Sequence, residues 1–321
     1  MDFAQGTMHA NDFQSAITST RRTVADYDQL AASASLTRFT SDSPFAQFVF
    51  TPRATLLGTV DRLNNAANTM QTQTAALIDA METSFANDFR TDGGHWMVQV
   101  DDPAAINELV SRYGKQRSYQ TLQEHLDDLK SLYNLEQRVR QQVADAIAAV
   151  HAGETNAAQI AVPTEAGAMD AAGWMGTAQS VASTLGVQVK QTSVYSCPGA
   201  DDNGDDNADM VIGFFCGGSQ ASRNEVNMLV THPEWPMVER SPLLVDYTKH
   251  ELAHRSIMIV CGTTEPEIAA NRTEAVTNSY AVQFLGASRE RIAGSQQGLA
   301  AYAMDAQSDQ IAQSIHNGTC A

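Results

Sequence analysis

His250-Glu251-Leu252-Ala253-His254 is the stretch that constrains this chain most, because it has the pattern H-E-x-x-H. The residues from Pro242 to Lys249 contain no glycine and no further proline, which favours a helix that begins at Pro242. Residues four positions apart lie on one face of an α-helix, so both imidazoles can bind one Zn²⁺ ion. The Glu251 carboxylate can then accept a proton from water at the metal. The pattern therefore predicts a zinc site on this helix.

A second segment offers the ligand that the first one lacks. A catalytic zinc site needs a third protein ligand and keeps its fourth position open. Glu274 lies 20 positions after His254, in a segment, 271–286, that is expected to form a helix ended by Gly286. Asn278 lies one turn beyond Glu274 on the same face. Its side chain could hydrogen-bond a ligand imidazole and fix the tautomer of that ring.

These residues resemble the gluzincin branch of zinc metallopeptidases, in which H-E-x-x-H precedes a helix with a ligand glutamate and a polar residue four positions later. The resemblance implies three zinc ligands, namely His250, His254 and Glu274. It implies that Glu251 is the general base and that Asn278, where many gluzincins have Asp, supports a ligand. The segments 261–270 and 274–281 also look like secreted metallopeptidase-like proteins of Gram-positive actinobacteria.

The first half of the chain is expected to be almost entirely helical. Apolar residues recur at alternating steps of four and three between positions 56 and 81, as in a seam between helices, and a second stripe runs from 122 to 150. Breaks at 40–44 and 91–94 separate the helices. Because short loops make neighbouring helices antiparallel, residues 1–152 are predicted to form an elongated bundle or hairpin.

The second half has a mixed pattern. Residues 153–167 have the composition of a linker. After them we expect a helix over 169–185 that ends at Gly186, and strands over 187–195, 210–216 and 226–230. The H-E-x-x-H helix, the Glu274 helix and a last helix over 299–315 follow. The sequence thus predicts an α+β protein in which a helical domain, 1–152, precedes a small zincin-like catalytic domain, 168–321.

The four cysteines, Cys197, Cys216, Cys261 and Cys320, all lie in the second half. Four cysteines allow three pairings. Their spacing favours Cys197–Cys216 across a short acidic loop and Cys261–Cys320 at the end of the chain, where a disulfide would hold a terminus that otherwise frays. Disulfides form in oxidising compartments, so we expect a secreted bacterial protein whose export signal is not within this numbering.

The acidic loop between the first two cysteines has some features of a cation site. Asp201, Asn203 and Asp205 alternate like the start of a calcium-binding loop. The glycine and the distal glutamate of an EF-hand are missing from their positions, so a solvated acidic turn remains an alternative. Calcium is therefore a second candidate cofactor beside one zinc ion.

Composition restricts the partners. A net charge of −17 argues against nucleic acid, because its binding draws on basic patches. No stretch of the sequence approaches 18 consecutive apolar residues, so no transmembrane segment is expected. A hydrophobic content of 43% excludes global disorder. The expected partner is a protein or peptide substrate, and the N-terminal helices could bind a protein partner or self-associate.

The predicted activity is peptide hydrolysis, in which Glu251 assists the attack of zinc-bound water on a peptide bond. Stabilisation of the oxyanion needs a further donor. The candidates are Tyr280, Tyr302 and His316, between which the sequence does not choose. The alternative is an interaction protein, such as an adhesin or a secretion-system component, in which the helical half is functional and the zincin module is structural or degenerate.

Overall fold

The structure is a computed structural model that describes residues 93–100, 102–113, 122–162, 174–197, 211–217 and 222–321, and scattered positions between 22 and 89. The chain divides into two compact units, one formed by residues 1–87 and 115–133 and the other by residues 88–114 and 134–321. The expected calcium loop, with Asp201, Asn203 and Asp205, lies outside the described residues. So does most of the apolar seam that we predicted between positions 56 and 81.

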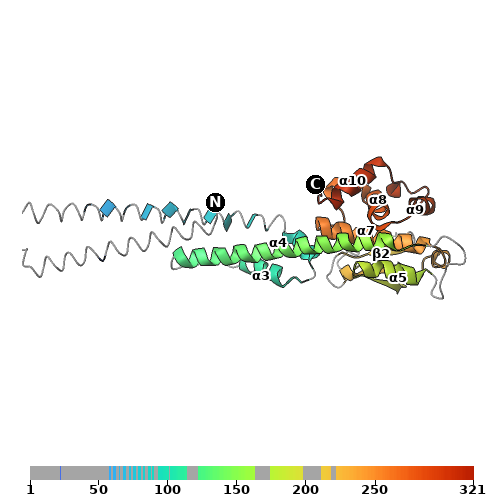
Figure 1. Ribbon diagram of the computed structural model, residues 1–321, viewed down its shortest axis with the longest axis horizontal. Coiled ribbons are helices and arrows are strands. Elements are labelled where there is room, and N and C mark those ends of the chain that lie inside the picture. The colour runs from blue at the N-terminus through green and yellow to red at the C-terminus, as the bar shows by residue number, and fades with distance from the viewer. Residues whose placement is uncertain are drawn as a thin grey trace, which may run out of the picture. The chain divides into compact units, whose positions relative to one another are not determined.

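The first unit is helical wherever it is described. All described positions from 58 to 87 are in helix, as is the beginning of the long helix α4 (Leu122–Gln159) (Figure 1). Within this unit His125 Nε2 lies 3.2 Å from Glu82 Oε2. The apolar stripe that we predicted along α4 is confirmed where it is described, since its members Leu129, Leu132, Val139 and Val150 are buried.

The helix α4 continues into the segment that we expected to be a linker. Residues 153–159 are helical, so the predicted linker begins too early in the chain. Gly153, the first residue of the predicted linker, lies within the helix for a packing reason. A Cβ atom at this position would lie 2.7 Å from the backbone oxygen of Thr184. The glycine therefore lets the end of the next helix approach α4 closely.

The second unit contains the remaining elements. Besides α4 and the helical residues 93–99, its α-helices include α3 (Ala104–Tyr113), α5 (Met175–Thr184), α6 (Trp235–Val238), α7 (Leu243–Cys261), α8 (Thr273–Leu285), α9 (Arg289–Ser295) and α10 (Ala306–His316). Its strands are β1 (Gln188–Thr192), β2 (Gly213–Phe215) and β3 (Glu225–Leu229). Strands β1 and β2 and helix α8 fall inside their predicted ranges, and β3 begins and ends one residue earlier than its predicted range. Helix α7 carries H-E-x-x-H, as the sequence predicted. The described chain is thus mostly helical with one small sheet.

The sheet has the order β1-β3-β2. Strand β1 pairs with β3 in parallel, with Val189 opposite Val226, and β2 pairs with β3 in antiparallel orientation, with Phe214 opposite Asn227. This order makes β2 an edge strand of the described sheet. Strand β2 also contacts α7, the helix that carries H-E-x-x-H.

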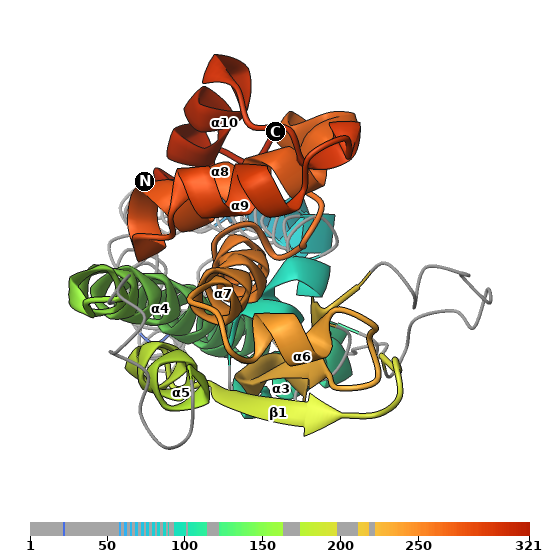
Figure 2. The same cartoon turned by 90° about the vertical axis from the view of Figure 1, so that its right-hand side faces the viewer.

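Helix α7 is the central element of this unit. In Figure 2 it lies between α8 and α9 on one side and α5, α6 and the sheet on the other. Nearly all of its residues are buried, polar ones included. Asp246 accepts hydrogen bonds from Arg291 and from the backbone of Ser288, and Lys249 donates to the Gly286 carbonyl at 2.9 Å. These bonds satisfy buried charges and fix the turn between α8 and α9 against α7.

Residues 93–113 belong to the same compact unit as α7, although we grouped them with the N-terminal helices. Gln99 Nε2 donates to the carbonyls of Ile259 and Val260 at 3.0 and 3.1 Å, where the last turn of α7 leaves carbonyl groups without helical partners. Arg223 donates to the carbonyls of Val98 and Val100. The segment thus supports the end of α7 and the start of β3.

Both expected disulfides are present, Cys197–Cys216 and Cys261–Cys320. The second joins the last residue of α7 to the end of the chain, and Ile268 N donates to Cys320 O at 3.2 Å beside it. In the part of the chain that the structure describes, none of the helices has the length and apolar character needed to span a membrane.

Candidate metal centre

Three side chains from α7 and α8 converge as the sequence predicted. Glu274 Oε2 lies 3.1 Å from His250 Nε2 and 3.4 Å from His254 Nε2. The two imidazoles share one face of α7, with ring centroids 4.8 Å apart and planes at 86°. Glu274 is in the first turn of α8, which packs on α7. The pairing of these two helices therefore brings together residues that are 20 positions apart in the sequence.

The distances suit a small divalent cation. Ligands bound at 2.0–2.1 Å in a tetrahedron are about 3.3 Å from each other, close to both distances measured here. Glu274 Oε2 is buried and makes no hydrogen bond within the described structure. Two imidazole nitrogens and a carboxylate oxygen are ligands that zinc prefers, whereas calcium and magnesium favour oxygen alone. The three residues fit one zinc ion.

The hydrogen bonds of Asn278 determine which nitrogen of His250 is available. The Asn278 amide nitrogen donates to the Tyr302 carbonyl at 3.0 Å and to Gln296 Oε1 at 2.7 Å. Because a carbonyl only accepts, the amide group has one orientation, with its oxygen 2.7 Å from His250 Nδ1. His250 Nδ1 must then carry the proton of the neutral ring. Its Nε2 is left with a lone pair directed at Glu274, which is the role expected for Asn278.

His254 is oriented in the same way, by a weaker contact. The Thr277 hydroxyl donates to the Thr273 carbonyl at 2.9 Å, so its oxygen is the acceptor for His254 Nδ1 at 3.4 Å. Helix α8 thus supplies the candidate ligand Glu274 and a partner for each imidazole. Thr277 was not among the predicted residues, although its position three residues after Glu274 places it on the same face.

The charges of the site shift the pKa values of its members. Burial would lower the pKa of His250, but contact with Glu274 and the charge of Glu251 outweigh it and raise this pKa to about 9. Burial would raise the pKa of Glu274, but its contacts with His250 and His254 hold it well below its usual range. The cluster therefore favours a positive charge between His250 and Glu274. A proton supplies this charge in the metal-free protein, and a metal ion would have to displace that proton.

Glu251 lies beside the edge strand of the sheet. Its side chain is almost fully buried, and this burial raises the pKa of its carboxyl group, although a hydrogen bond from the Phe215 backbone opposes the shift. A Cβ atom at Gly213 would lie 3.2 Å from Glu251 Cγ and 3.3 Å from Oε1. Gly213 therefore allows β2 to come close to the carboxylate. A carboxylate whose pKa is raised accepts a proton more readily than an ordinary one, as a general base must.

A cavity of about 260 Å³ opens onto this carboxylate and onto His250. Its polar lining includes Tyr302, which was predicted, and His232, which was not. His232 Nδ1 accepts from the Glu234 backbone at 3.2 Å, so the neutral ring carries its proton on Nε2. Burial, together with the negative charges of the site, raises the pKa of Tyr302 above its usual range, so its hydroxyl stays a donor. Both side chains are candidate oxyanion donors.

The other two candidate oxyanion donors, Tyr280 and His316, do not line this cavity. The Tyr280 hydroxyl donates to Glu154 Oε1 at 2.8 Å and lies 3.2 Å from His316 Nδ1. Burial and the adjacent carboxylate raise the pKa of Tyr280 above its usual range. Tyr280 follows Glu274 by six residues, a rotation of about 240° around the helix. Its side chain therefore leaves α8 on a different face.

Comparison of the chain with protein-family models, with curated protein sequences and with solved structures finds no match. The arguments for a function therefore come from the residues of the chain and their arrangement.

Proposed function

We propose that this chain is a zinc-dependent metallopeptidase with a zincin-like catalytic domain, similar to the gluzincins. His250, His254 and Glu274 hold one zinc ion. The observation that carries the proposal is the convergence of both Nε2 atoms on Glu274 Oε2 at 3.1 and 3.4 Å, with Glu251 at the adjoining cavity. Three protein ligands beside a cavity are typical of a catalytic zinc site.

Zinc in this site would lower the pKa of a bound water and polarise a peptide carbonyl. The side chains of the protein supply the remaining chemistry. Glu251 takes the proton of the attacking water and delivers it to the leaving amine, since its carboxylate faces the cavity and its pKa is raised. Tyr302 or His232 donates a hydrogen bond to the oxyanion from the wall of the cavity.

A peptide is the substrate that suits the surroundings of this cavity. Strand β2 is at the edge of the described sheet, and Gly213, its first residue, lines the cavity beside Glu251. An extended peptide can add to an exposed sheet edge through main-chain hydrogen bonds. Paired along β2, a peptide would run past Glu251, so its scissile bond would lie within reach of the carboxylate. The two disulfides support secretion, because such bonds persist in oxidising compartments.

The test compares two isosteric substitutions. Glu251→Gln keeps the size of the side chain and removes its ability to exchange a proton, so hydrolysis of a fluorogenic peptide library should fall by about 10²–10⁴-fold while zinc content stays unchanged. Glu290→Gln, on the exposed surface of α9, is the control and should keep full activity. Retained hydrolysis by Glu251→Gln would refute its role. Bound zinc in a wild-type protein that hydrolyses no peptide would favour the interaction-protein alternative.

A further inference from the structure

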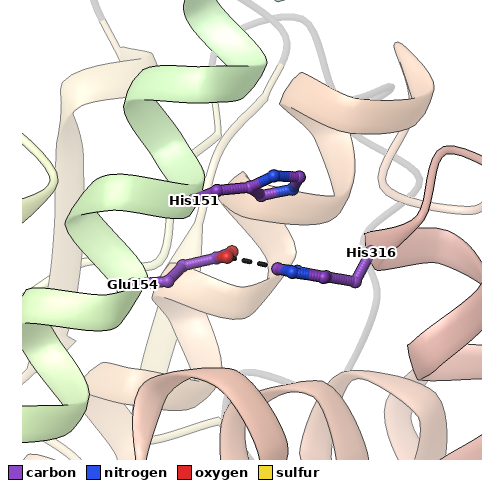
Figure 3. Close-up of side chains that lie close together, drawn as sticks. All are labelled: His151, Glu154 and His316. Carbon is purple, nitrogen blue, oxygen red and sulfur yellow. Dashed lines mark ion pairs between the residues drawn. The ribbon is translucent and has the colours of Figure 1, made fainter.

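A second cluster of metal-binding residue types lies outside the proposed catalytic site. His151 and Glu154 are on α4, one turn apart, and His316 is at the end of α10 (Figure 3). The three side chains point toward one another from these two helices. Each offers one ligand atom, and these atoms all lie within 4.8 Å of one another. None of the three has a part in the proposed hydrolysis of peptides.

Glu154 is the most unusual member because its carboxylate is buried and only one of its two oxygens accepts a hydrogen bond. Its residue is 1% exposed. Oε1 accepts the hydroxyl of Tyr280 at 2.8 Å, which fixes the orientation of the carboxylate. Oε2 is also buried, makes no hydrogen bond within the described structure, and lies 3.3 Å from His316 Nδ1. A buried anionic oxygen without a hydrogen bond is costly unless a cation lies beside it, either protonated His316 or a metal ion.

The two histidines present nitrogens to the same place. His151 Nε2 is buried and has no hydrogen-bond partner among the described residues. Its ring lies 4.0 Å from the ring of His316, between centroids, at an angle of 31°. The other face of His316 stacks on Phe284 at 3.8 Å and 4°. The position of His316 is therefore held by packing, and His151 supplies an unused acceptor nitrogen beside it.

We propose that His151, Glu154 and His316 bind a second divalent transition-metal ion, of the zinc class. Two imidazole nitrogens and one carboxylate oxygen favour zinc over calcium or magnesium. Tetrahedral ligands are about 3.3 Å apart, so the most separated pair here must close by up to about 1.5 Å. Glu154 Oε2 already lies 3.3 Å from His316 Nδ1, so the movement falls to His151, whose residue is only partly buried and can rotate its side chain. Tyr280 holds Oε1, so that Oε2 is the ligand atom.

Such an ion would join α4 to α10, two helices far apart in the sequence. His316 precedes Cys320 by four residues, and that cysteine is already tied to the end of α7. Tyr280 comes from α8, the helix of Glu274 and Asn278. The second ion would therefore hold together the helices that surround the proposed catalytic centre, and its effect should be on stability.

The test is the zinc content of the full chain after equilibrium dialysis at neutral pH against buffered free zinc. The wild type should hold about two ions. His316→Asn and His151→Ala should each hold about one, and so should His250→Ala/His254→Ala. Adding His316→Asn to that double variant should leave none. Asn317→Ala, an exposed neighbour on the same turn, is the matched control and should hold about two. In the double variant, zinc should also raise the melting temperature, and His316→Asn should abolish this rise.

The proposal would be overturned if His316→Asn and His151→Ala each held as many zinc ions as the wild type. It would also be overturned by a His250→Ala/His254→Ala variant that binds no zinc and gains no thermal stability from it. The partly exposed His151 gives a variant that does not depend on the packing of His316. A different result would refute the proposed catalytic zinc site: a His250→Ala/His254→Ala variant that holds as many zinc ions as the wild type.

Discussion

Asn278 shows how one amide can decide the chemistry of a neighbouring imidazole. Its nitrogen donates to the Tyr302 carbonyl, so its oxygen accepts a hydrogen bond from Nδ1–H of His250. We expect Asn278→Ala to lower zinc affinity by about 10–100-fold, because the ring loses the partner that fixes its tautomer. Gln283→Ala, on the exposed side of α8, is the control. Competition with a fluorescent zinc chelator measures both, and equal affinities would remove the role assigned to Asn278.

Tyr302 is the predicted oxyanion donor that lies at the cavity. Tyr302→Phe should lower kcat by about 10²–10³-fold with zinc content and KM little changed, since the lost hydrogen bond belongs to the transition state. Steady-state kinetics on a single peptide would separate kcat from KM. An unchanged kcat in Tyr302→Phe, with a loss in His232→Gln instead, would assign the donor to His232.

Local periodicity explains which residues the sequence predicted and which it missed. His250, Glu251 and His254 share one helix, and Asn278 follows Glu274 by one turn, so a spacing rule finds them. His232 and Gly213 come from other segments and reach the site only through the sheet and the turn after β3. The pair His151 and Glu154 had helical spacing as a signal, but nothing in the sequence pointed to its third member, His316.

At the level of elements, α7 is positioned by its ends as much as by its sides. Gly262 ends it with φ +72°, and a Cβ atom there would lie 2.2 Å from His95 Cβ. Gly262→Ala should therefore destabilise the fold by more than the roughly 1–2 kcal/mol of a left-handed alanine. Gly298→Ala is a matched control, with φ +92° and no atom within 4 Å. Urea unfolding compares the two, and equal losses would show that the contact with His95 carries no energy.

The boundaries of elements followed from sequence where a glycine acts as a helix stop and failed where it serves close packing. Gly186 and Gly286, the two predicted helix stops, both have positive φ at helix ends, which an L-residue adopts with strain. Gly153 is the exception, because its missing Cβ makes room for Thr184. A single sequence does not distinguish these two uses of glycine, so the predicted linker began inside α4.

At the level of the whole molecule, the disulfides lower the conformational entropy of the unfolded chain. Cys261 and Cys320 are 59 positions apart, and Cys197 and Cys216 are 19 apart. Loop-closure entropy assigns about 4 kcal/mol to the longer loop and about 3 kcal/mol to the shorter one. The double variant Cys261→Ser/Cys320→Ser should therefore lose more stability than Cys197→Ser/Cys216→Ser. Unfolding by guanidinium chloride measures both, and the opposite order would show that local contacts outweigh chain entropy.

The sequence predicted which helices and strands are present better than it predicted how they group into two compact units. A helical first half and a small sheet before the H-E-x-x-H helix are both present in the described residues. The grouping of residues 93–113 with α7 depends on Gln99 and Arg223, whose hydrogen-bond partners lie more than 120 positions away. Hydrogen bonds between residues so far apart leave no periodic pattern in the sequence, so the sequence could not predict them.

The central claim is that His250, His254 and Glu274 bind zinc, and anomalous X-ray scattering tests it directly. Crystals grown with zinc should show an anomalous peak above the zinc edge, and none below it, within about 2.0–2.2 Å of the two Nε2 atoms and a Glu274 oxygen. A map from zinc-saturated crystals without a peak between these three side chains would contradict the claim.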